Sequence, residues 1–262
     1  MKVTFLGAGL YGEALGRLAE ANDHEIKFYD PFRFPDVKLE DVVSEAEAIV
    51  YVAPAEAYKE ILPGLPKDKP LILASKGFVS LEPFAEFSNF SALGGAAFAE
   101  DIMEAKNQLR LTASSEISEQ IFTTDLVTIE YTEDTKGVVL CGALKNVYAL
   151  GAGMFLEGEN PEQYFSEAYF EMQDILKANG ADPETAALSC GVADLLLSST
   201  ASGRNFQFGR EIAEHPGSKV EPVGTVEGLT VIKSFESFPD FVVPEGAELF
   251  YKIVSEAKRA TE

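Results

Sequence analysis

The stretch Val3-Thr4-Phe5-Leu6-Gly7-Ala8-Gly9-Leu10-Tyr11-Gly12 decides how the first half of this chain folds. A short apolar run, typical of a buried strand, leads directly into three glycines with G-x-G-x-x-G spacing, and a helical segment over 13–22 follows. In this context the first glycine makes a tight turn, the second lets the backbone approach a pyrophosphate, and the third lets the helix pack closely on the strand. The stretch therefore predicts a dinucleotide-binding unit with the pyrophosphate at the helix N-terminus.

The acid at the end of the second expected strand indicates which dinucleotide binds. Asp30 follows Gly12 by 18 residues, where a carboxylate accepts hydrogen bonds from a ribose 2′-OH. The same charge repels a 2′-phosphate, so we expect NAD(H) rather than NADP(H), although Arg33 is close enough to weaken that preference. A glycine-rich turn without a ligand, and an Asp30 that is only a surface carboxylate, are the alternatives.

The rest of the first half repeats the alternation of strands and helices. We expect strands at 3–6, 25–29, 48–53, 71–75 and 91–93, and two further strands at 108–113 and 126–131 with a helix over 115–122 between them. Ser114 or Ser115 is suited to cap that helix. This rhythm is typical of a mostly parallel sheet with helices on both faces.

From residue 133 the spacing of apolar residues changes to that of helices. We expect helices over 135–154, 161–179, 183–197, 204–214, 224–238 and 245–258, separated by Gly, Pro and Ser. The prediction is thus an α/β dinucleotide-binding domain over residues 1–132 and an all-helical domain over residues 133–262. Such a division favours a ligand cleft at the junction.

The composition argues against several classes of function. Among 262 residues, 43 Asp and Glu against 21 Lys and Arg give a net charge of −22, which repels nucleic acids and anionic lipids. We find no apolar run long enough to span a membrane and no targeting segment, so we expect no membrane insertion and a cytoplasmic protein. Cys141 and Cys190 lie in apolar segments and are expected as buried thiols. The two histidines, His24 and His215, lie in polar surroundings, so we expect no metal site.

Basic residues set among small or apolar neighbours are the candidates for chemistry. Lys76 follows the strand expected at 71–75, at the carboxyl end of the sheet where α/β proteins bind ligands. Lys145 lies in an apolar helix, where a lysine either extends its ammonium to solvent or has a function. Arg204 and Asn205 form a polar pair before another helix. These groups suit the reduction of a carbonyl by NADH, which needs a proton donor and cations for an anionic substrate.

Seven motifs, in order, resemble those of the NAD(P)-dependent glycerol-3-phosphate dehydrogenases along nearly the whole chain. They are Gly7-Ala8-Gly9-Leu10-Tyr11-Gly12, Ser75-Lys76-Gly77, Gly95-Ala96-Ala97-Phe98-Ala99-Glu100, Gly142-Ala143-Leu144-Lys145-Asn146-Val147, Ala193-Asp194-Leu195, Gly203-Arg204-Asn205 and Val226-Glu227-Gly228. The resemblance implies a Rossmann-type domain followed by a helical domain, with the active site between them. The chain departs from the family pattern at Gly94, Ala97 and Gly203, where the family usually carries hydroxyl side chains.

The resemblance also implies residue roles. Lys145 is the implied catalytic lysine, which exchanges a proton with the substrate, and Asp194 and Lys76 are implied as further catalytic residues. The implied cofactor contacts are Gly7, Gly9, Leu10, Tyr11, Gly12, Asp30, Lys76, Ala99, Arg204 and Glu227. The implied substrate contacts are Lys76, Gly95, Lys145, Asn146, Asp194, Ser198, Arg204 and Asn205.

The implied function is the NAD-dependent interconversion of sn-glycerol 3-phosphate and dihydroxyacetone phosphate, with NADP as the other cofactor. The substrate is then a small phosphorylated three-carbon molecule, which Arg204 and Asn205 favour. Two alternatives stay open, namely a related reductase acting on a 2-oxo or 2-hydroxy acid, and an NAD(H)-binding sensor without turnover. The sequence also leaves a homodimer open, because the apolar helix over 138–155 suits a dimer face as well as a core.

Overall fold

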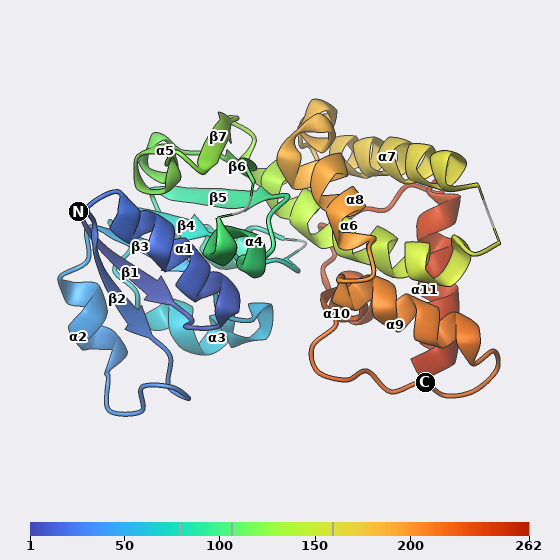
Figure 1. Cartoon of the computed structure of the whole chain (residues 1–262), viewed down its shortest axis with the longest axis horizontal. Coiled ribbons are helices and arrows are strands. Elements are labelled where there is room, and N and C mark those ends of the chain that lie inside the picture. The colour runs from blue at the N-terminus through green and yellow to red at the C-terminus, as the bar shows by residue number, and fades with distance from the viewer. Residues whose placement is uncertain (79, 106, 159, 262) are drawn as a thin grey trace. The chain divides into compact units, whose positions relative to one another are not determined.

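The computed structural model describes residues 1–78, 80–105, 107–158 and 160–261, which form two compact units (Figure 1). Unit 1 comprises Met1–Lys76 and Leu81–Thr135, and unit 2 comprises Gly77–Ser80 and Lys136–Glu262. The domain boundary predicted after residue 132 differs from this division in two respects. The division falls after Thr135, and the segment 77–80, which we assigned to the first domain, groups with the second.

Unit 1 is built on a seven-stranded sheet in the order β2-β1-β3-β4-β5-β6-β7. The strands are β1 (Lys2–Leu6), β2 (Glu25–Tyr29), β3 (Ala48–Tyr51), β4 (Leu71–Leu73), β5 (Phe90–Gly95), β6 (Leu109–Ala113) and β7 (Val127–Tyr131). Neighbouring strands are parallel except β5 and β6, which are antiparallel. The expected mostly parallel sheet is confirmed.

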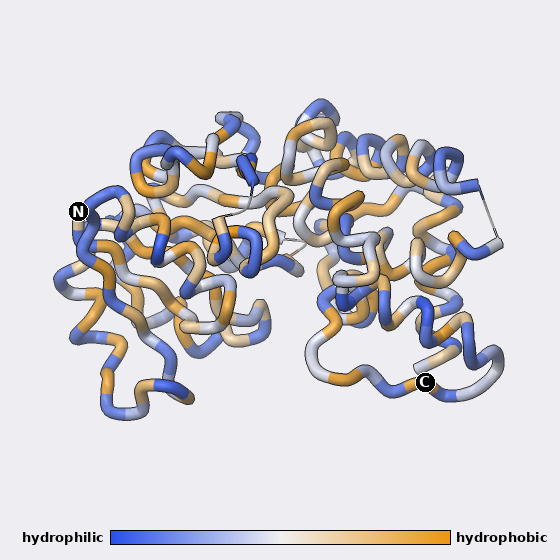
Figure 2. Tube along the Cα trace, in the orientation of Figure 1, coloured by the Kyte–Doolittle hydropathy of each residue, from blue (hydrophilic) through white to orange (hydrophobic). Residues whose placement is uncertain are grey.

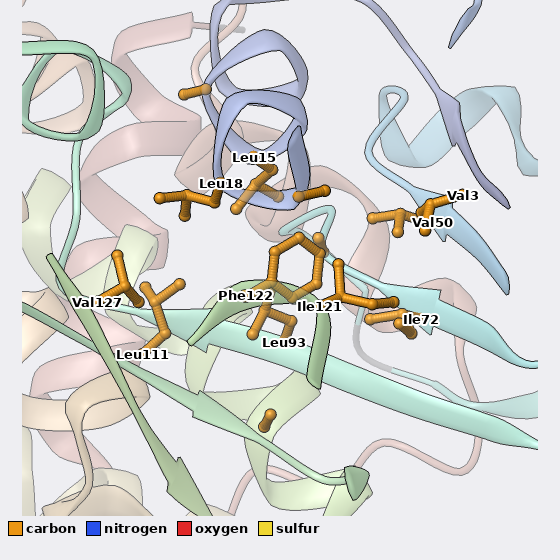
Figure 3. Close-up of a cluster of buried hydrophobic side chains, with 14 of the residues drawn as sticks. Val3, Leu15, Leu18, Val50, Ile72, Leu93, Leu111, Ile121, Phe122 and Val127 are labelled. Carbon is orange, nitrogen blue, oxygen red and sulfur yellow. The ribbon is translucent and has the colours of Figure 1, made fainter. Parts of the chain in front are cut away.

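Helices cover both faces of this sheet because its strands are apolar on both. One face packs against α1 (Leu10–Ala21), α4 (Ala99–Glu104) and α5 (Glu116–Phe122). Figure 3 shows Leu15 and Phe122 of these helices directed toward the strand residues of this core. On the other face, Thr4 of β1 donates a hydrogen bond through Oγ1 to the carbonyl of Val42 at 2.9 Å. Val42 belongs to α2 (Leu39–Ser44), and the short helix α3 (Tyr58–Ile61) completes the unit.

Helix α1 begins at Leu10, three residues before the helix that we expected to begin at residue 13. Gly9 is its N-cap, with extended backbone angles, and the backbone N–H of Glu13 donates to the Gly9 carbonyl at 2.9 Å. The glycine motif therefore runs into the first turn of the helix instead of preceding it. The expected cap of α5 is confirmed, since Ser115 Oγ accepts from the Ser118 N–H.

Unit 2 is helical. Its helices are α6 (Thr135–Phe155), α7 (Pro161–Ala178), α8 (Asp194–Ser198), α9 (Arg204–Glu214), α10 (Glu227–Ser234) and α11 (Glu248–Thr261). Every residue of α6 from Gly137 to Met154 is buried, as expected of a helix that is apolar around its whole circumference. By contrast, α7 carries hydrophilic residues along much of its length (Figure 2).

The expectation of no apolar run long enough to span a membrane is wrong for α6. By its length and composition this helix is apolar enough to cross a membrane, although Lys145 and Asn146 lie within it. However, 89% of its most apolar window is buried inside the protein, as in the core helix of a folded domain. No other helix in the described part of the chain satisfies the same criterion.

The single helix expected over 183–197 is also wrong. The chain forms a 3-10 turn at Pro183–Ala187, a π turn at Ser189–Ala193 and then α8. Leu188 is extended between them, and Gly191 has non-helical angles of φ −98° and ψ −108°. A side chain at Gly191 would meet the Ala186 carbonyl oxygen at 2.1 Å, so the sharp bend needs a glycine there.

Candidate functional site

The three motif glycines of unit 1 meet three different surroundings. Gly7 has a φ of +114°, and a Cβ there would lie 2.8 Å from the Ala53 backbone nitrogen. A Cβ at Gly12 would lie 2.4 Å from the Gly7 carbonyl oxygen, whereas a Cβ at Gly9 would meet nothing within 4 Å. Gly7 and Gly12 are thus required by the protein's own packing. The open space beside Gly9 fits the approach of a dinucleotide pyrophosphate to the backbone.

Asp30 ties the end of β2 to the glycine turn. Its Oδ2 accepts from the Ala8 N–H at 3.0 Å, and its Oδ1 accepts from the N–H groups of Phe32 and Arg33 at 3.1 and 3.2 Å. Burial by itself raises the pKa of this carboxyl, but the three backbone hydrogen bonds and the Arg33 charge outweigh burial and lower it. Asp30 is therefore ionised, and a carboxylate retains acceptor capacity for a ribose hydroxyl besides these bonds.

Lys76, which follows β4, lies beside the glycine motif. Its Nζ is 5.7 Å from the centroid of the Tyr11 ring, a distance at which a cation and an aromatic face attract each other. Leu10 is exposed next to Tyr11. The structure thus brings Lys76 together with the glycine motif, both of which we predicted as parts of the cofactor site.

Gly95 and Ala99 lie further along the same unit. Gly95 ends β5 with a φ of +140°, and a Cβ there would lie 2.8 Å from Leu111 Cα, so the β5–β6 pairing requires this glycine. Ala99 begins α4, which packs against α1. Both positions have structural reasons for their residue types, and their predicted ligand contacts stay predictions.

Unit 2 contains a buried charged cluster. Lys145 Nζ is 3.1 Å from Asp194 Oδ1 and donates to Ser198 Oγ at 2.7 Å. Ser198 in turn donates to Asp194 Oδ1 at 3.2 Å. The three residues are between 2 and 5% exposed. The structure therefore brings together three residues that we predicted to bind the substrate, two of them as catalytic.

The break before α8 builds this cluster. Because the bend at Gly191 ends the preceding turns, Asp194 becomes the first residue of α8 and Ser198 the last. Residues four apart on a helix lie on the same face, so both side chains reach the same lysine. A lysine amine held by a carboxylate and a hydroxyl can exchange a proton with an oxygen that comes within hydrogen-bond distance.

A second group in unit 2 joins two asparagines to a backbone N–H. Asn205 Nδ2 donates to Asn146 Oδ1 at 2.8 Å, and Asn205 Oδ1 accepts from the Gly228 N–H at 2.8 Å. A Cβ at Gly228 would lie 2.4 Å from the Asn146 carbonyl oxygen, so the glycine permits this approach. Asn146 follows Lys145 in the chain, which connects the two groups.

Arg204 and Glu227, both predicted as cofactor contacts, form an ion pair. Arg204 Nη2 lies 2.5 Å from Glu227 Oε1, with the side chains 62% and 26% exposed. Gly203 precedes Arg204, and a Cβ there would lie 2.0 Å from the Ser198 carbonyl oxygen. The packing of this chain therefore leaves no room for a hydroxyl side chain at position 203.

Sequence reasoning missed Glu13, which pairs with Arg33 through Nη1 at 2.5 Å. An acid one residue after the glycine motif is a signal, but the motif alone does not say which residue of the loop after β2 it meets. Sequence reasoning also missed Glu171, because the partners of this residue cannot be identified from its position in the chain. This buried carboxylate of α7 accepts hydrogen bonds from Tyr148 and from the start of α11, which are far apart in the sequence.

A family model and curated relatives both show similarity to the glycerol-3-phosphate dehydrogenases. Residues 134–242 match the family model described as NAD-dependent glycerol-3-phosphate dehydrogenase C-terminus. The NAD(P)+ glycerol-3-phosphate dehydrogenase of Citrifermentans bemidjiense is 28% identical over 264 residues, covering 81% of this chain and 79% of that protein. The enzyme of the same name from Teredinibacter turnerae is 26% identical over 285 residues, covering 89% and 84%.

A solved structure supports the fold. The crystal structure of glycerol-3-phosphate dehydrogenase from Coxiella burnetii has a TM-score of 0.83 to this chain, covering 99% of it and 97% of that chain at 18% identity. The predicted α/β fold, a Rossmann-type unit followed by a helical one, is thereby confirmed. The family model spans much of unit 2 and the relatives extend over both units, so the chain is similar to the NAD(P)-dependent glycerol-3-phosphate dehydrogenases along most of its length.

Proposed function

We propose that this chain is an NAD-dependent oxidoreductase that interconverts sn-glycerol 3-phosphate and dihydroxyacetone phosphate, with Lys145 as the proton donor and acceptor. The observation that carries the proposal is the buried Lys145 amine, held by Asp194 and Ser198. Lysine is almost never fully buried unless it is paired, because desolvation of an ammonium costs free energy. A buried lysine with two polar partners is therefore a strong candidate for proton transfer.

The chain's own residues account for the proton. The nicotinamide of bound NAD(H) would exchange the hydride with substrate C2. In reduction, the Lys145 ammonium donates a proton to the C2 oxygen as that oxygen gains charge. In oxidation, the neutral amine takes the proton of the C2 hydroxyl, and the carboxylate of Asp194 stabilises the ammonium that forms. Ser198 keeps the amine in position in both directions.

Arg204 and Asn205 are the proposed phosphate contacts. The Arg204 guanidinium carries five N–H donors, and its fork matches the oxygens of a phosphate. Asn205 Nδ2 carries two hydrogens, one of which goes to Asn146. Both residues stand in the first turn of α9, where backbone N–H groups favour an anion. The other predicted substrate contacts, Lys76, Gly95 and Asn146, remain part of this proposal.

The cofactor contacts are proposed from unit 1 and from α9 and α10. The glycine turn would hold the pyrophosphate, and Asp30 would accept from the adenosine ribose. Tyr11 and Lys76, which lie together, would complete this site. The remaining contacts proposed for the cofactor are Leu10, Ala99, Arg204 and Glu227.

The test is the oxidation of NADH by dihydroxyacetone phosphate, followed by the loss of NADH absorbance. Unphosphorylated dihydroxyacetone, Lys145→Met and the matched exposed-lysine variant Lys219→Met are the comparisons. We expect turnover that requires the phosphate, a loss of about 100-fold or more in Lys145→Met, and wild-type turnover in Lys219→Met. NADH binding without turnover of dihydroxyacetone phosphate would overturn the reaction and leave a 2-oxo acid reductase or a binding protein.

A further inference from the structure

The loop after β2 folds Arg33 back against the glycine turn. Its Nη1 donates a hydrogen bond to the Ala8 carbonyl and lies 2.5 Å from Oε1 of Glu13 on α1. The backbone N–H of the same residue donates to Asp30 Oδ1 at 3.2 Å. Arg33 therefore stands between two carboxylates, one at the end of β2 and one near the start of α1.

This arrangement bears on the adenosine end of a bound dinucleotide. In sheets of this kind the acid that ends the second strand meets the ribose 2′-OH, and an arginine close to it accommodates a 2′-phosphate. Arg33 is such an arginine by its place in the chain. Its charge is already engaged by Glu13, and the group of Asp30, Arg33 and Glu13 carries a net negative charge. A 2′-phosphate brought to this group meets repulsion rather than a cation available to bind it.

We propose that Glu13 determines the choice between NAD(H) and NADP(H), by holding Arg33 on the glycine turn and by adding a second negative charge beside the ribose. The inference rests on the proposed function, because it requires the glycine turn to bind a dinucleotide. Glu13 is a positioning residue in this account, since it acts through Arg33. The chain carries an arginine suited to NADP(H) but is selective for NAD(H).

Because the Arg33–Glu13 ion pair is partly exposed, it can be removed by mutation without unfolding the protein. The Arg33 and Glu13 side chains are 49% and 35% exposed. Ion pairs with this exposure contribute little to stability, because solvent screens the attraction and ordering two long side chains costs entropy. Removal of the Glu13 charge is therefore expected to change nucleotide preference while leaving the unit folded.

The variant Glu13→Gln keeps the size of the side chain and removes its charge. The matched control is Glu20→Gln, which makes the same change on the same face of α1, about 10 Å further along the helix. Nucleotide fluorescence titrations give the dissociation constants of NADH and NADPH for each protein. In Glu13→Gln we expect NADPH to gain about fivefold or more relative to NADH, and in Glu20→Gln no change in this ratio.

Two further variants test the part played by Arg33. In Glu13→Gln/Arg33→Ala the gain for NADPH should disappear, because the released cation is absent. Glu13→Asp keeps the charge on a shorter side chain and should retain most of the preference for NADH. A gain for NADPH that survives the loss of Arg33 would overturn the role given to that residue.

The outcomes separate this inference from the proposed function. A wild-type protein that binds neither nucleotide would overturn the dinucleotide site and the inference with it. Wild-type binding of NADH, combined with an unchanged NADPH to NADH ratio in Glu13→Gln, would overturn the inference alone. A wild-type preference for NADPH would also overturn it, while leaving a dinucleotide-dependent reaction intact.

Discussion

Lys145 Nζ and Asp194 Oδ1 lie 3.1 Å apart, and their side chains are only 6% and 2% exposed. Each charge has lost most of its contact with water, and the other charge and Ser198 contribute to its compensation. The pair is therefore important for stability as well as for the proposed proton transfer. A loss of activity in a Lys145 variant must therefore be interpreted together with the stability of that variant.

We predict that Lys145→Met lowers the free energy of unfolding by about 3–5 kcal/mol, because it removes the cation that lies 3.1 Å from the buried Asp194 carboxylate. The double variant Lys145→Met/Asp194→Asn removes both charges and should recover a substantial part of that loss. Urea denaturation of the two proteins measures the difference. Equal stability of the single and double variants would show that Asp194 does not carry an uncompensated charge. The double variant also serves as a folded control in the activity test.

The glycine motif gives a second prediction, in which one substitution weakens NADH binding and another lowers the stability of the protein. Gly9→Ala places a methyl group where the protein has nothing within 4 Å, so we expect an unchanged melting temperature but weaker NADH binding. Gly12→Ala places it 2.4 Å from the Gly7 carbonyl oxygen, so we expect a loss of about 1–3 kcal/mol in stability. Thermal melts and NADH titrations of both variants test this. Wild-type NADH affinity in a well-folded Gly9→Ala would contradict a pyrophosphate at this position.

Much of the fold could be predicted because the signals are local. Apolar runs of strand length gave all seven strands of the described sheet, and the helix over 204–214 has the predicted bounds. The start of α1 was misjudged because Gly9, with no side chain, serves as the N-cap. The break before α8 was missed because it depends on the approach of Gly191 to the Ala186 carbonyl, a contact that periodicity does not describe.

The candidate site could be predicted only in part for the same reason. Lys145 stands out in the sequence as a charge in an apolar helix, and the motifs point to Asp194 and Asn205. Their partners depend on the packing of helices that are distant in the chain, as when Asn205 accepts from the Gly228 N–H. The pairing of Arg33 with Glu13 depends on the course of a loop, which composition does not determine.

Glu171 gives a prediction about pH. Its carboxylate accepts from the Leu249 and Phe250 N–H groups at 2.7 and 2.9 Å, and from the Tyr148 hydroxyl at 2.9 Å. It thereby caps the start of α11 from α7. Burial raises the pKa of this carboxyl, and the three hydrogen bonds only partly oppose the shift.

The raised pKa fixes the sign of the effect. Between the ordinary pKa of 4.5 and the higher folded value, the folded protein binds a proton that the unfolded chain does not. The contribution of Glu171 to stability is therefore complete below the ordinary pKa and declines as the pH rises through the folded pKa. We predict that the melting temperature of the wild type, minus that of Glu171→Gln, decreases over this interval and is constant above it. A difference that increases with pH would contradict the shift.

The crossing of α6 and α9 gives the last prediction. A Cβ at Gly209 would lie 2.0 Å from the Leu150 carbonyl oxygen, and one at Gly153 would lie 2.1 Å from the Phe206 carbonyl oxygen. The two helix backbones are thus in direct contact, and neither oxygen can move without disturbing its own helix. We predict that Gly209→Ala destabilises the protein by about 3 kcal/mol or more. Gly246→Ala, where a Cβ meets nothing within 4 Å, is the control and should melt at or slightly above the wild-type temperature.

The same substitution bears on substrate binding, because α9 begins at Arg204, a proposed phosphate contact. We expect Gly209→Ala to raise the KM for the substrate in protein that remains folded. An unchanged KM would show that the packing of α6 against α9 does not influence the substrate site.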